Sequence, residues 1–393
     1  MKTLTLLVFA HLLGTFLSFS QNSNRVITTG VPFLMITSDA RAAGMGELGV
    51  ATSADNYSQQ WNPAKYAFAS NEKGVGLSYT PYLSKLVDDI FLGNIIYFKK
   101  IDDRSSWATS LRYFSLGEIQ FNELIAGSIV DQGIQRPTEL TLDLSYALKL
   151  SSVFSMAVAG RFIYSDLKIA MDADTSSASS LGVDIAAFYE SELFKIKSNS
   201  AVVRSGINIS NIGPRLNYDS GSQKSFIPTN LRLGAGLDLI FDDNNTVGFY
   251  TEFSKLLVPT PVAIYDSSQN FLGYRQPDID FINGIFTSFT DAPDGLSEEL
   301  SEITAAMGIE YSFQDSFSIR TGFFNESQVK GSRQYLTMGA GFNLNFIDID
   351  LSYLFSTSRV RNPLENTIRF SLSINLDQSP SQLQSDDKNI NTL

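Results

Sequence analysis

The chain has 393 residues, 12% of them aromatic and only 18% charged, so it is long enough for one large fold or two ordinary domains. Its formal net charge is −12 and its Lys and Arg residues are scattered, which argues against a nucleic-acid partner, because phosphate recognition needs clustered positive charge. No linker rich in Pro, Ser or Gly divides the chain, so we expect one domain.

Residues 1–20 have the pattern of an export signal peptide. Lys2 supplies the positive charge, Leu4 to Leu17 form the apolar core, and Ser18 to Ser20 provide small residues for the cleavage site. We therefore expect Gln21 to begin the mature protein. The alternative, a membrane anchor, is less favoured because the apolar run is short for a spanning helix.

The chemistry available to the mature chain is narrow. The only His, His11, lies in the signal peptide and the chain has no Cys, which argues against Ser-His-Asp and Cys-His catalysis, ordinary zinc sites and disulfides. Adjacent carboxylates such as Asp88-Asp89 and Glu298-Glu299 mostly occupy apparent turns, and we interpret them as solvated turn charges. The sequence predicts no catalytic residue, metal site or cofactor, and we expect no enzymatic activity.

The stretch from residue 39 to residue 64 is rich in small residues and has neither strand alternation nor a long helical stripe. Its Ala and Gly residues allow close backbone packing, and Pro63 keeps Asn62 out of the α region. We predict that residues 21–73 form an N-terminal periplasmic segment and a plug inside a barrel. The plug residues singled out are Asp39 and Arg41 as a local charge pair, Gly44, Gly46, Asn62 and Pro63.

Gly44, Gly46 and Gly49 also match the dinucleotide fingerprint G-x-G-x-x-G. That motif needs a strand directly before it and a βαβ unit around it, and the pattern predicts neither here. We therefore favour a packing role for these glycines.

From Gly74 onward, apolar residues alternate with small or polar ones in runs of about ten, the length with which a tilted strand crosses a bilayer. An even number of such strands closes an antiparallel barrel, whereas a soluble sandwich would have to bury every apolar stripe. The sequence therefore predicts an all-β fold, a 14-stranded antiparallel transmembrane β-barrel over residues 74–376. The predicted strands lie near residues 75–82, 88–100, 106–117, 138–149, 154–168, 179–190, 200–210, 230–241, 246–256, 302–313, 317–325, 335–346, 348–357 and 366–376.

The predicted connections are short after even-numbered strands and often long after odd-numbered ones, as in outer-membrane barrels. This pattern places both termini in the periplasm and the long loops outside. Aromatic residues near strand ends, among them Phe98, Phe114 and Phe324, predict interfacial girdles. The polar residues 377–393 predict a disordered periplasmic tail.

The longest predicted loop, residues 257–301, is unusually apolar for an exposed segment. Our hypothesis is that it is extracellular and docks a protein partner; the alternative is a lid that folds inward over the lumen. The apolar residues that carry the docking hypothesis are Phe271, Phe281, Ile282, Ile285, Phe286 and Phe289.

The run Asp-Ala-Arg-Ala-Ala-Gly-Met-Gly at residues 39–46, with Val31-Pro32-Phe33-Leu34 before it, resembles the start of the PorV family. That family forms outer-membrane barrels of the Bacteroidetes type IX secretion system, within the wider superfamily of FadL-like barrels. The FadL-like hatch carries an Asn-Pro-Ala turn, which Asn62, Pro63 and Ala64 match here.

The resemblance implies an outer-membrane cargo carrier. Such a protein receives cargo with a conserved C-terminal domain from a very large translocon barrel (SprA/Sov-like). It then delivers that cargo to a surface attachment complex (PorU, PorQ, PorZ-like), which cleaves the signal and conjugates the cargo to lipopolysaccharide. Outer-membrane lipids and lipopolysaccharide are further expected partners, and nucleic acid is not.

Two other functions are weighed beside the carrier. A FadL-like transporter of a hydrophobic small molecule would have a greasy lumen pocket and a lateral opening, whereas a carrier would have a sealed lumen and an apolar external rim. A barrel hydrolase is third, because without His no residue spacing here indicates a nucleophile and its base.

Overall fold

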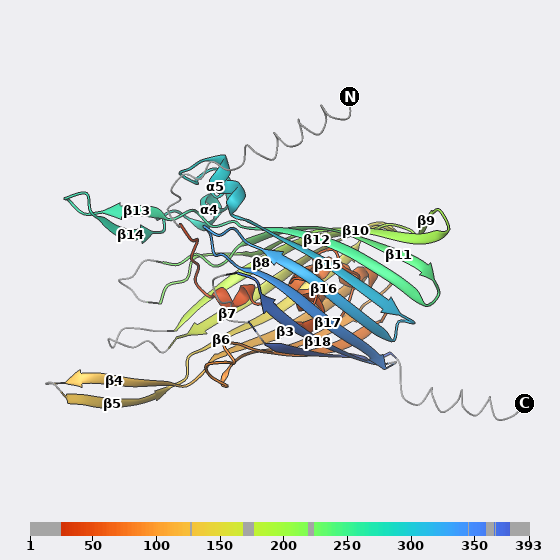
Figure 1. Ribbon diagram of the computed structural model, residues 1–393, viewed down its shortest axis with the longest axis horizontal. Coiled ribbons are helices and arrows are strands. Elements are labelled where there is room, and N and C mark those ends of the chain that lie inside the picture. Colours follow the sequence, from red (N-terminus) through yellow and green to blue (C-terminus); the bar gives the residue numbers. More distant parts are fainter. Residues whose placement is uncertain are drawn as a thin grey trace, which may run out of the picture.

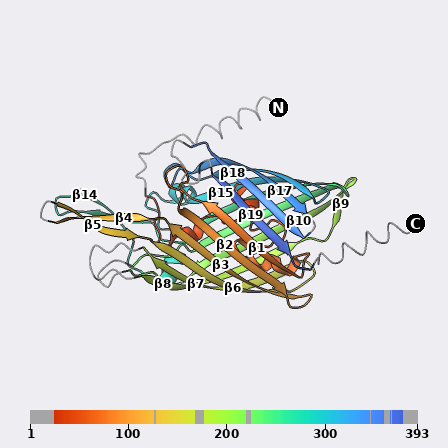
Figure 2. The ribbon, with the colours of Figure 1, turned by 90° about the horizontal axis from the view of Figure 1, so that it is seen from below.

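The structure is a computed structural model that describes residues 25–125, 128–167, 177–218, 224–344, 346–358, 365 and 367–377. The predicted signal peptide and almost all of the predicted disordered tail lie outside these residues. Long antiparallel strands form one sheet that closes on itself, because β1 (Lys73–Pro81) pairs with β19 (Ile368–Asn375) (Figure 1). In Figure 2, β19, β1 and β2 lie side by side across this closure.

The wall contains fourteen strands, as the alternation predicts, and the predicted fold class is confirmed. A short strand, β9 (Phe194–Ile196), extends the edge of β10. The other strands of the wall are β2 (Ile90–Lys100), β3 (Ser105–Leu116), β6 (Thr138–Lys149), β7 (Phe154–Asp166), β8 (Ala178–Glu190), β10 (Asn199–Ile212), β11 (Asn230–Asp242), β12 (Asn245–Leu256), β15 (Ile303–Phe313), β16 (Phe317–Asn325), β17 (Gln334–Leu344) and β18 (Ile347–Ser356).

The strand β6 shows how the alternation is used. Its apolar side chains Leu142, Leu144 and Tyr146 point outward and are about half exposed, whereas Asp143 and Ser145 between them are buried in the lumen. An apolar outside around a polar inside is the arrangement that suits a barrel surrounded by lipid.

Aromatic residues divide between the two sides of the wall. Tyr113 and Phe162 are exposed on the outer face, as expected for a girdle, but Phe98, Phe114 and Phe324 point inward and are buried. The girdle prediction is therefore wrong for these three residues, because the lumen is filled and has its own apolar core.

The connections differ between the two ends of the barrel. We call the end with residues 82–89, 117–137, 213–229, 257–302 and 326–333 the long-loop end, and the opposite end the short-turn end. The hairpins and helices of the long-loop end project from the wall in Figure 1. They are β4 (Ile119–Ile125), β5 (Ser128–Gln135), β13 (Val262–Tyr265), β14 (Phe271–Arg275), α4 (Phe281–Thr287) and α5 (Leu296–Ser301).

The N-terminal segment lies inside the barrel and runs along its lumen. Among the described residues, no helix has the length and apolar character required to cross a membrane. The short helices of this segment are η1 (Pro32–Met35), α2 (Ala40–Ala43), α3 (Ser58–Trp61) and η2 (Pro63–Phe68).

The two described ends of the chain lie at opposite ends of the barrel. At the long-loop end, the Gly30 amide donates to the Phe226 carbonyl and Arg25 contacts Asp294, while Asp377 lies at the short-turn end beside β1. A periplasmic location shared by the N-terminal segment and the C-terminal end is therefore wrong for residues 25–30. The alternation of the wall strands cannot show in which direction a plug runs.

Candidate functional site

Backbone-to-backbone contacts join the plug to one side of the wall. A Cβ atom on Gly322 would lie 2.0 Å from the Met45 carbonyl carbon, and one on Gly44 would lie 3.0 Å from the Cα of Gly339. Gly46 has a φ of 80°, a conformation that side chains disfavour, and its amide donates to the Thr337 hydroxyl. The predicted close packing at Gly44 and Gly46 is thus present.

The plug approaches a second part of the wall, at β10 and β11, in the same way. Gly206 of β10 pairs with Gly234 of β11, and Cβ atoms there would lie 2.1 Å and 2.4 Å from atoms of Val50. A Cβ atom on Gly49 would collide with the Trp61 ring. Glycines of the G-x-G-x-x-G match therefore serve packing, and no strand leads into them.

Arg41 is the centre of an ion network that links the plug to three strands. Its guanidinium contacts Asp55 of the plug and Glu310 of β15, each at 2.9 Å. Arg320 of β16 bridges Glu310 and Asp350 of β18, each at 2.5 Å. The side chains of this network are 6 to 20% exposed, so each charge depends largely on its partners.

Asp39 does not pair with Arg41, and the predicted local charge pair is wrong. One Asp39 oxygen caps α2 by accepting the Ala42 amide at 2.8 Å, and the other accepts the Trp61 indole N–H at 2.7 Å. The carboxylate therefore folds the plug onto itself, while Arg41 reaches residues that are distant in the sequence.

Asn62 and Pro63 form the predicted turn at the end of α3. The Asn62 side chain donates to the carbonyls of Val50 and Ala187, at 3.1 and 2.9 Å, and its oxygen accepts the Ala64 amide. Pro63 begins η2, where its missing N–H costs nothing. This turn joins two parts of the plug to β8.

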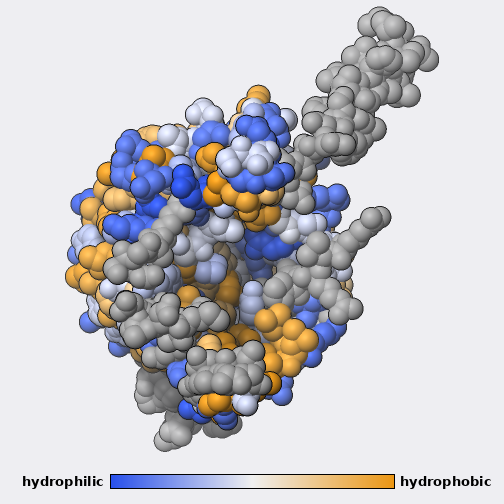
Figure 3. Space-filling model, turned by 90° about the vertical axis from the view of Figure 1, so that its left-hand side faces the viewer, coloured by the Kyte–Doolittle hydropathy of each residue, from blue (hydrophilic) through white to orange (hydrophobic). Residues whose placement is uncertain are grey.

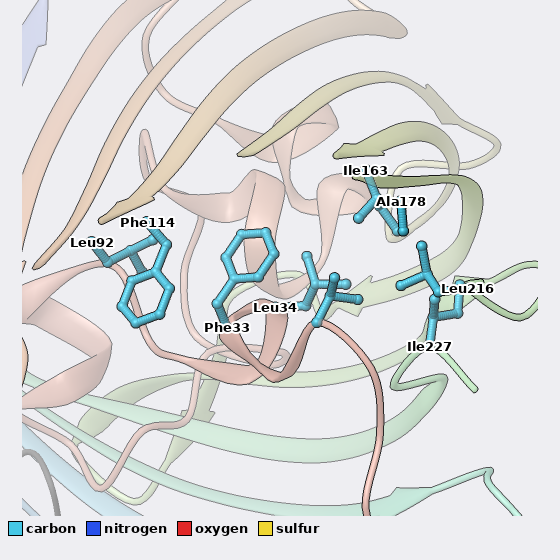
Figure 4. Close-up of a cluster of buried hydrophobic side chains, with 9 residues drawn as sticks. Phe33, Leu34, Leu92, Phe114, Ile163, Ala178, Leu216 and Ile227 are labelled. Atoms are coloured by element: carbon cyan, nitrogen blue, oxygen red, sulfur yellow. The ribbon is translucent and has the colours of Figure 1, made fainter. Parts of the chain in front are cut away.

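Apolar side chains of the chain itself fill the lumen near the long-loop end (Figure 4). Phe33 of η1 stacks on Phe114 of β3, with ring centroids 6.0 Å apart, and Leu34 packs in the same cluster. The other buried members of the cluster are Val31, Leu92, Ile163, Ala178, Leu216 and Ile227.

The main cavities of the lumen border charged residues, and the plug lies between them. A cavity of about 430 Å³ at the short-turn end is bordered by Arg41, Asp55 and Asp348, among other polar residues. Towards the long-loop end, cavities of about 120 and 260 Å³ share Glu302 and Arg333 in their linings. Each of these three cavities, as lined by the described residues, has charged side chains in its wall, which does not suit a purely hydrophobic ligand.

Each wall strand pairs with both of its neighbours among the described residues. β2 and β3 are joined without a register shift over their whole length. Wall register shifts occur between β8 and β10 near Asn211 and between β11 and β12 near Asp242. The Asn211 amide donates to the Asp184 carboxylate at its shift, so this irregularity is bridged from inside.

Four of the six predicted docking residues are exposed at the long-loop end, on two parts of the loop 257–302. Ile282, Phe286 and Phe289, on or just after α4, share one side of the segment with exposed fractions of 53, 71 and 45%, and Phe271 on β14 is 53% exposed. Leu272, which the sequence pattern did not single out, is 65% exposed. We call these five residues the loop surface.

The remaining predicted residues, Phe281 and Ile285, are half-buried. Gly284 holds α4 against the barrel, because it packs closely on Phe226 and Pro259. In Figure 3 the long-loop end is hollowed, and both apolar and hydrophilic residues border the hollow. The base of the loop 257–302 thus packs on the neighbouring loop at Phe226, while its exposed apolar residues point away from that contact, and docking stays a prediction.

Buried charges hold the base of this loop. Lys330 contacts Glu298 and Glu302, at 2.7 and 2.9 Å, and Lys255 contacts Glu299 and Glu302, at 3.0 and 2.5 Å. Glu298 and Glu299 are 7 and 8% exposed, so interpreting them as solvated turn charges is wrong.

Burial alone would raise the pKa of Glu298, but hydrogen bonds from Lys330 and the Asp294 amide hold it below its ordinary value. The lysine partners of these glutamates come from distant strands and loops, which the local sequence could not show. Among the described residues, no group of three or more metal-binding side chains gathers in one place.

The comparisons identify the family. A family model described as type IX secretion system protein PorV matches residues 19–263, which is more than half of the chain. No curated protein matches the sequence.

Two solved structures have a similar fold. The Pseudomonas putida toluene transporter TodX is 12% identical, with a TM-score of 0.50 over 85% of this chain and 97% of that one. The TodX deltaS2S3 mutant monoaromatic hydrocarbon channel is also 12% identical, with a TM-score of 0.50 over 86% and 98%. At this identity the likeness shows a FadL-like barrel fold alone. The chain belongs to the PorV family of the type IX secretion system and is an outer-membrane β-barrel.

Proposed function

We propose that the protein is a non-enzymatic carrier of the type IX secretion system. It binds cargo proteins through their conserved C-terminal domain, takes them from the translocon barrel and delivers them to the surface attachment complex. The observation that carries the proposal is the loop surface, an exposed apolar group on a chain whose lumen is filled. Exposed apolar patches of this kind mark protein interaction sites.

The filled lumen supports a carrier over a small-molecule transporter. The plug approaches the wall closely at two places, on β16 and β17 and on β10 and β11, and Phe33 and Leu34 fill the lumen near the long-loop end. A transported hydrocarbon would have to displace these side chains and then pass charged residues such as Arg41. What TodX transports is therefore not carried over to this chain.

The proposed orientation is based on the loops. Long loops face outward and short turns face the periplasm in outer-membrane barrels, which places the loop surface at the cell surface and Asp377 in the periplasm. At the surface, the loop 257–302 is within reach of the translocon barrel, of emerging cargo and of the attachment complex. No enzymatic step is required of this chain for such a transfer.

The test replaces the centre of the loop surface with charge. In the triple variant Ile282→Asp, Phe286→Asp and Phe289→Asp, we expect cargo to stay in the cell and the translocon barrel to be lost from affinity purifications. The matched control is the double variant Ile129→Asp and Ile134→Asp on the hairpin β4–β5. These two isoleucines are 76 and 55% exposed. Both barrels should still reach the outer membrane, as judged by their heat-dependent gel mobility.

Normal secretion by the triple variant would contradict docking through this surface. Recovery of the unaltered barrel without any secretion component, but with a stoichiometric hydrophobic ligand detected by mass spectrometry, would instead support transport.

A further inference from the structure

Arg232 of β11 makes fewer contacts than most arginines of the lumen, a property that it shares with Arg112, whose two hydrogen bonds are 3.3 and 3.4 Å long. Arg232 is 6% exposed, yet its one hydrogen bond within the described chain is a long one of 3.3 Å, from Nε to the side-chain oxygen of Asn230, and it forms only with the Asn230 amide turned to the orientation that satisfies both of its polar atoms. Its nearest charge is Glu252, 3.6 Å from Nε, and its guanidinium lies 5.2 Å from the Trp61 ring. By contrast, Arg320 donates to two carboxylates. A buried guanidinium with most of its donors unused carries a large desolvation cost.

The Arg232 side chain borders the cavity of about 120 Å³ that lies beside the plug, towards the long-loop end. Thr37, Ser254 and Thr304 place hydroxyl groups around the same space. Leu256, Glu302, Glu326 and Arg333 also line the neighbouring cavity of about 260 Å³, so the two spaces adjoin.

The larger cavity lies at the long-loop end, beside Val26 and Ile27. Val26 is 44% exposed, and Figure 3 shows the hollow at this end of the barrel. The two adjoining spaces therefore lead from the exposed Val26 at the long-loop end towards Arg232.

The chemistry of the smaller cavity selects a single negative charge. The planar fork of a guanidinium matches a carboxylate, with which it forms two parallel hydrogen bonds. Phosphate is disfavoured, because Glu47, Glu252, Glu302 and Glu326 line the same space and repel a dianion.

The larger cavity indicates which kind of chain the carboxylate terminates. Half of its lining residues are charged, namely Glu302, Glu326, Lys330 and Arg333, and the others are Val26, Ile27, Leu256 and Gly331. An alkyl chain would cover these charges without offering hydrogen bonds, whereas the amides of a peptide supply them. We propose that the Arg232 cavity binds the C-terminal carboxylate of an extended peptide that enters from the long-loop end. This goes beyond the docking function, since the loop surface takes no part in it.

The binding can be measured through Trp61 on the full chain purified in mild detergent. The chain has two Trp residues, so Trp107→Phe leaves Trp61 as the only indole, beside Arg232. The probes are N-acetyl-trialanine with a free carboxylate, the same peptide as an amide, octanoate and inorganic phosphate. We expect the free acid to change Trp61 emission in a saturable way and the amide to have no effect.

Each other result overturns the proposal. Equal binding of the amide would show that the carboxylate is not recognised. Binding of octanoate without the peptide would show an aliphatic acid site, and equal binding of phosphate would show an adventitious anion only.

Substitutions place the binding at Arg232. Arg232→Gln should weaken the free acid by at least about tenfold, as expected for the loss of charged hydrogen bonds. The control Arg204→Gln removes a lumen arginine that is already paired with Glu190 and Asp238, and should leave the affinity unchanged. Equal weakening in both variants would indicate general loosening and contradict the assignment.

A second variant keeps the test decisive if the Arg232→Gln barrel does not fold. Thr304→Leu narrows the same cavity without touching the guanidinium, because the only hydrogen bond of the Thr304 hydroxyl within the described chain is a long one of 3.4 Å to the Ser254 carbonyl. We expect it to abolish peptide binding while the barrel keeps its heat-dependent gel mobility. Unchanged binding in Thr304→Leu would show that the peptide lies elsewhere.

Discussion

Gly322 is a position where one added methyl group would collide with backbone of the plug, because its Cβ atom would lie 2.0 Å from the Met45 carbonyl carbon. The sequence identified the plug glycines Gly44 and Gly46 but not the wall glycines that face them. In an alternating strand, the pattern identifies a glycine only as a small residue. Its contact in the plug lies far away in the chain and so leaves no local signal. Arg41 shows the same limit, since it pairs with Glu310 rather than with its neighbour Asp39.

Gly322→Ala should therefore destabilise the barrel. Overpacking against backbone that cannot move typically costs about 1–3 kcal/mol, and we expect the unfolding temperature to fall accordingly. The control is Gly160→Ala in β7, where an added Cβ atom meets nothing within 4 Å. The measurement is the temperature at which each purified barrel loses its folded gel mobility. If both variants unfolded at the same temperature, the plug backbone at Met45 would be able to move aside for the added methyl group.

Arg41→Met should destabilise the protein much more than the loss of an exposed ion pair. It leaves Asp55 and Glu310 buried with one partner fewer, and breaking a buried pair typically costs about 3–5 kcal/mol. Arg136→Met removes the pair with Glu118, whose side chains are 74 and 45% exposed, where about 0–1 kcal/mol is expected. Chemical unfolding in detergent measures the stability of both variants. Similar denaturant midpoints for the two would mean that the Arg41 network contributes little to stability.

At the scale of the elements, the alternation predicted all fourteen wall strands, because each must cross the same lipid thickness with one apolar face. The loops obey no such constraint. The hairpins β4–β5 and β13–β14 and the helices α4 and α5 arise from contacts within and between loops, so the sequence indicated only that residues 257–301 were apolar. The burial of Glu298 and Glu299 on α5 was not predicted for the same reason, because their partners Lys330 and Lys255 lie elsewhere in the chain.

Lys330→Met should release the base of the loop 257–302 while the barrel remains folded. Glu298 would lose its lysine partner, and Lys330 also donates to the Arg25 carbonyl, so α5 and the N-terminal residues of the plug would loosen together. We expect faster protease cleavage in residues 290–300 than in the unaltered protein. Lys224→Met is the control, because this lysine is exposed and lies at the same end, where its backbone carbonyl rather than its ammonium group contacts Arg215. If protease cleaved the loop at the same rate in both variants, Lys330 would not be holding the base of the loop.

At the scale of the whole molecule, the plug makes the two ends of the barrel different. The chain enters the lumen beside the long loops, fills its apolar part with Phe33, crosses the ion network at Arg41 and leaves at the short-turn end before β1. Strand number and loop lengths could be predicted because they repeat around the wall. The direction of the plug could not, because either direction would leave the same alternation in the strands.

Cysteine labelling tests this direction, and the chain suits it because it contains no Cys. Val26→Cys lies at the long-loop end, and Ser70→Cys lies in an exposed position at the short-turn end. With a maleimide that does not cross membranes, we expect Val26→Cys to be labelled in intact cells and Ser70→Cys only after the outer membrane is permeabilised. If both were labelled only after permeabilisation, residue 26 would face the periplasm and the plug would not run from the cell surface inward. The opposite pattern, with Ser70→Cys labelled in intact cells, would reverse the whole barrel and remove the loop surface from the side where cargo emerges.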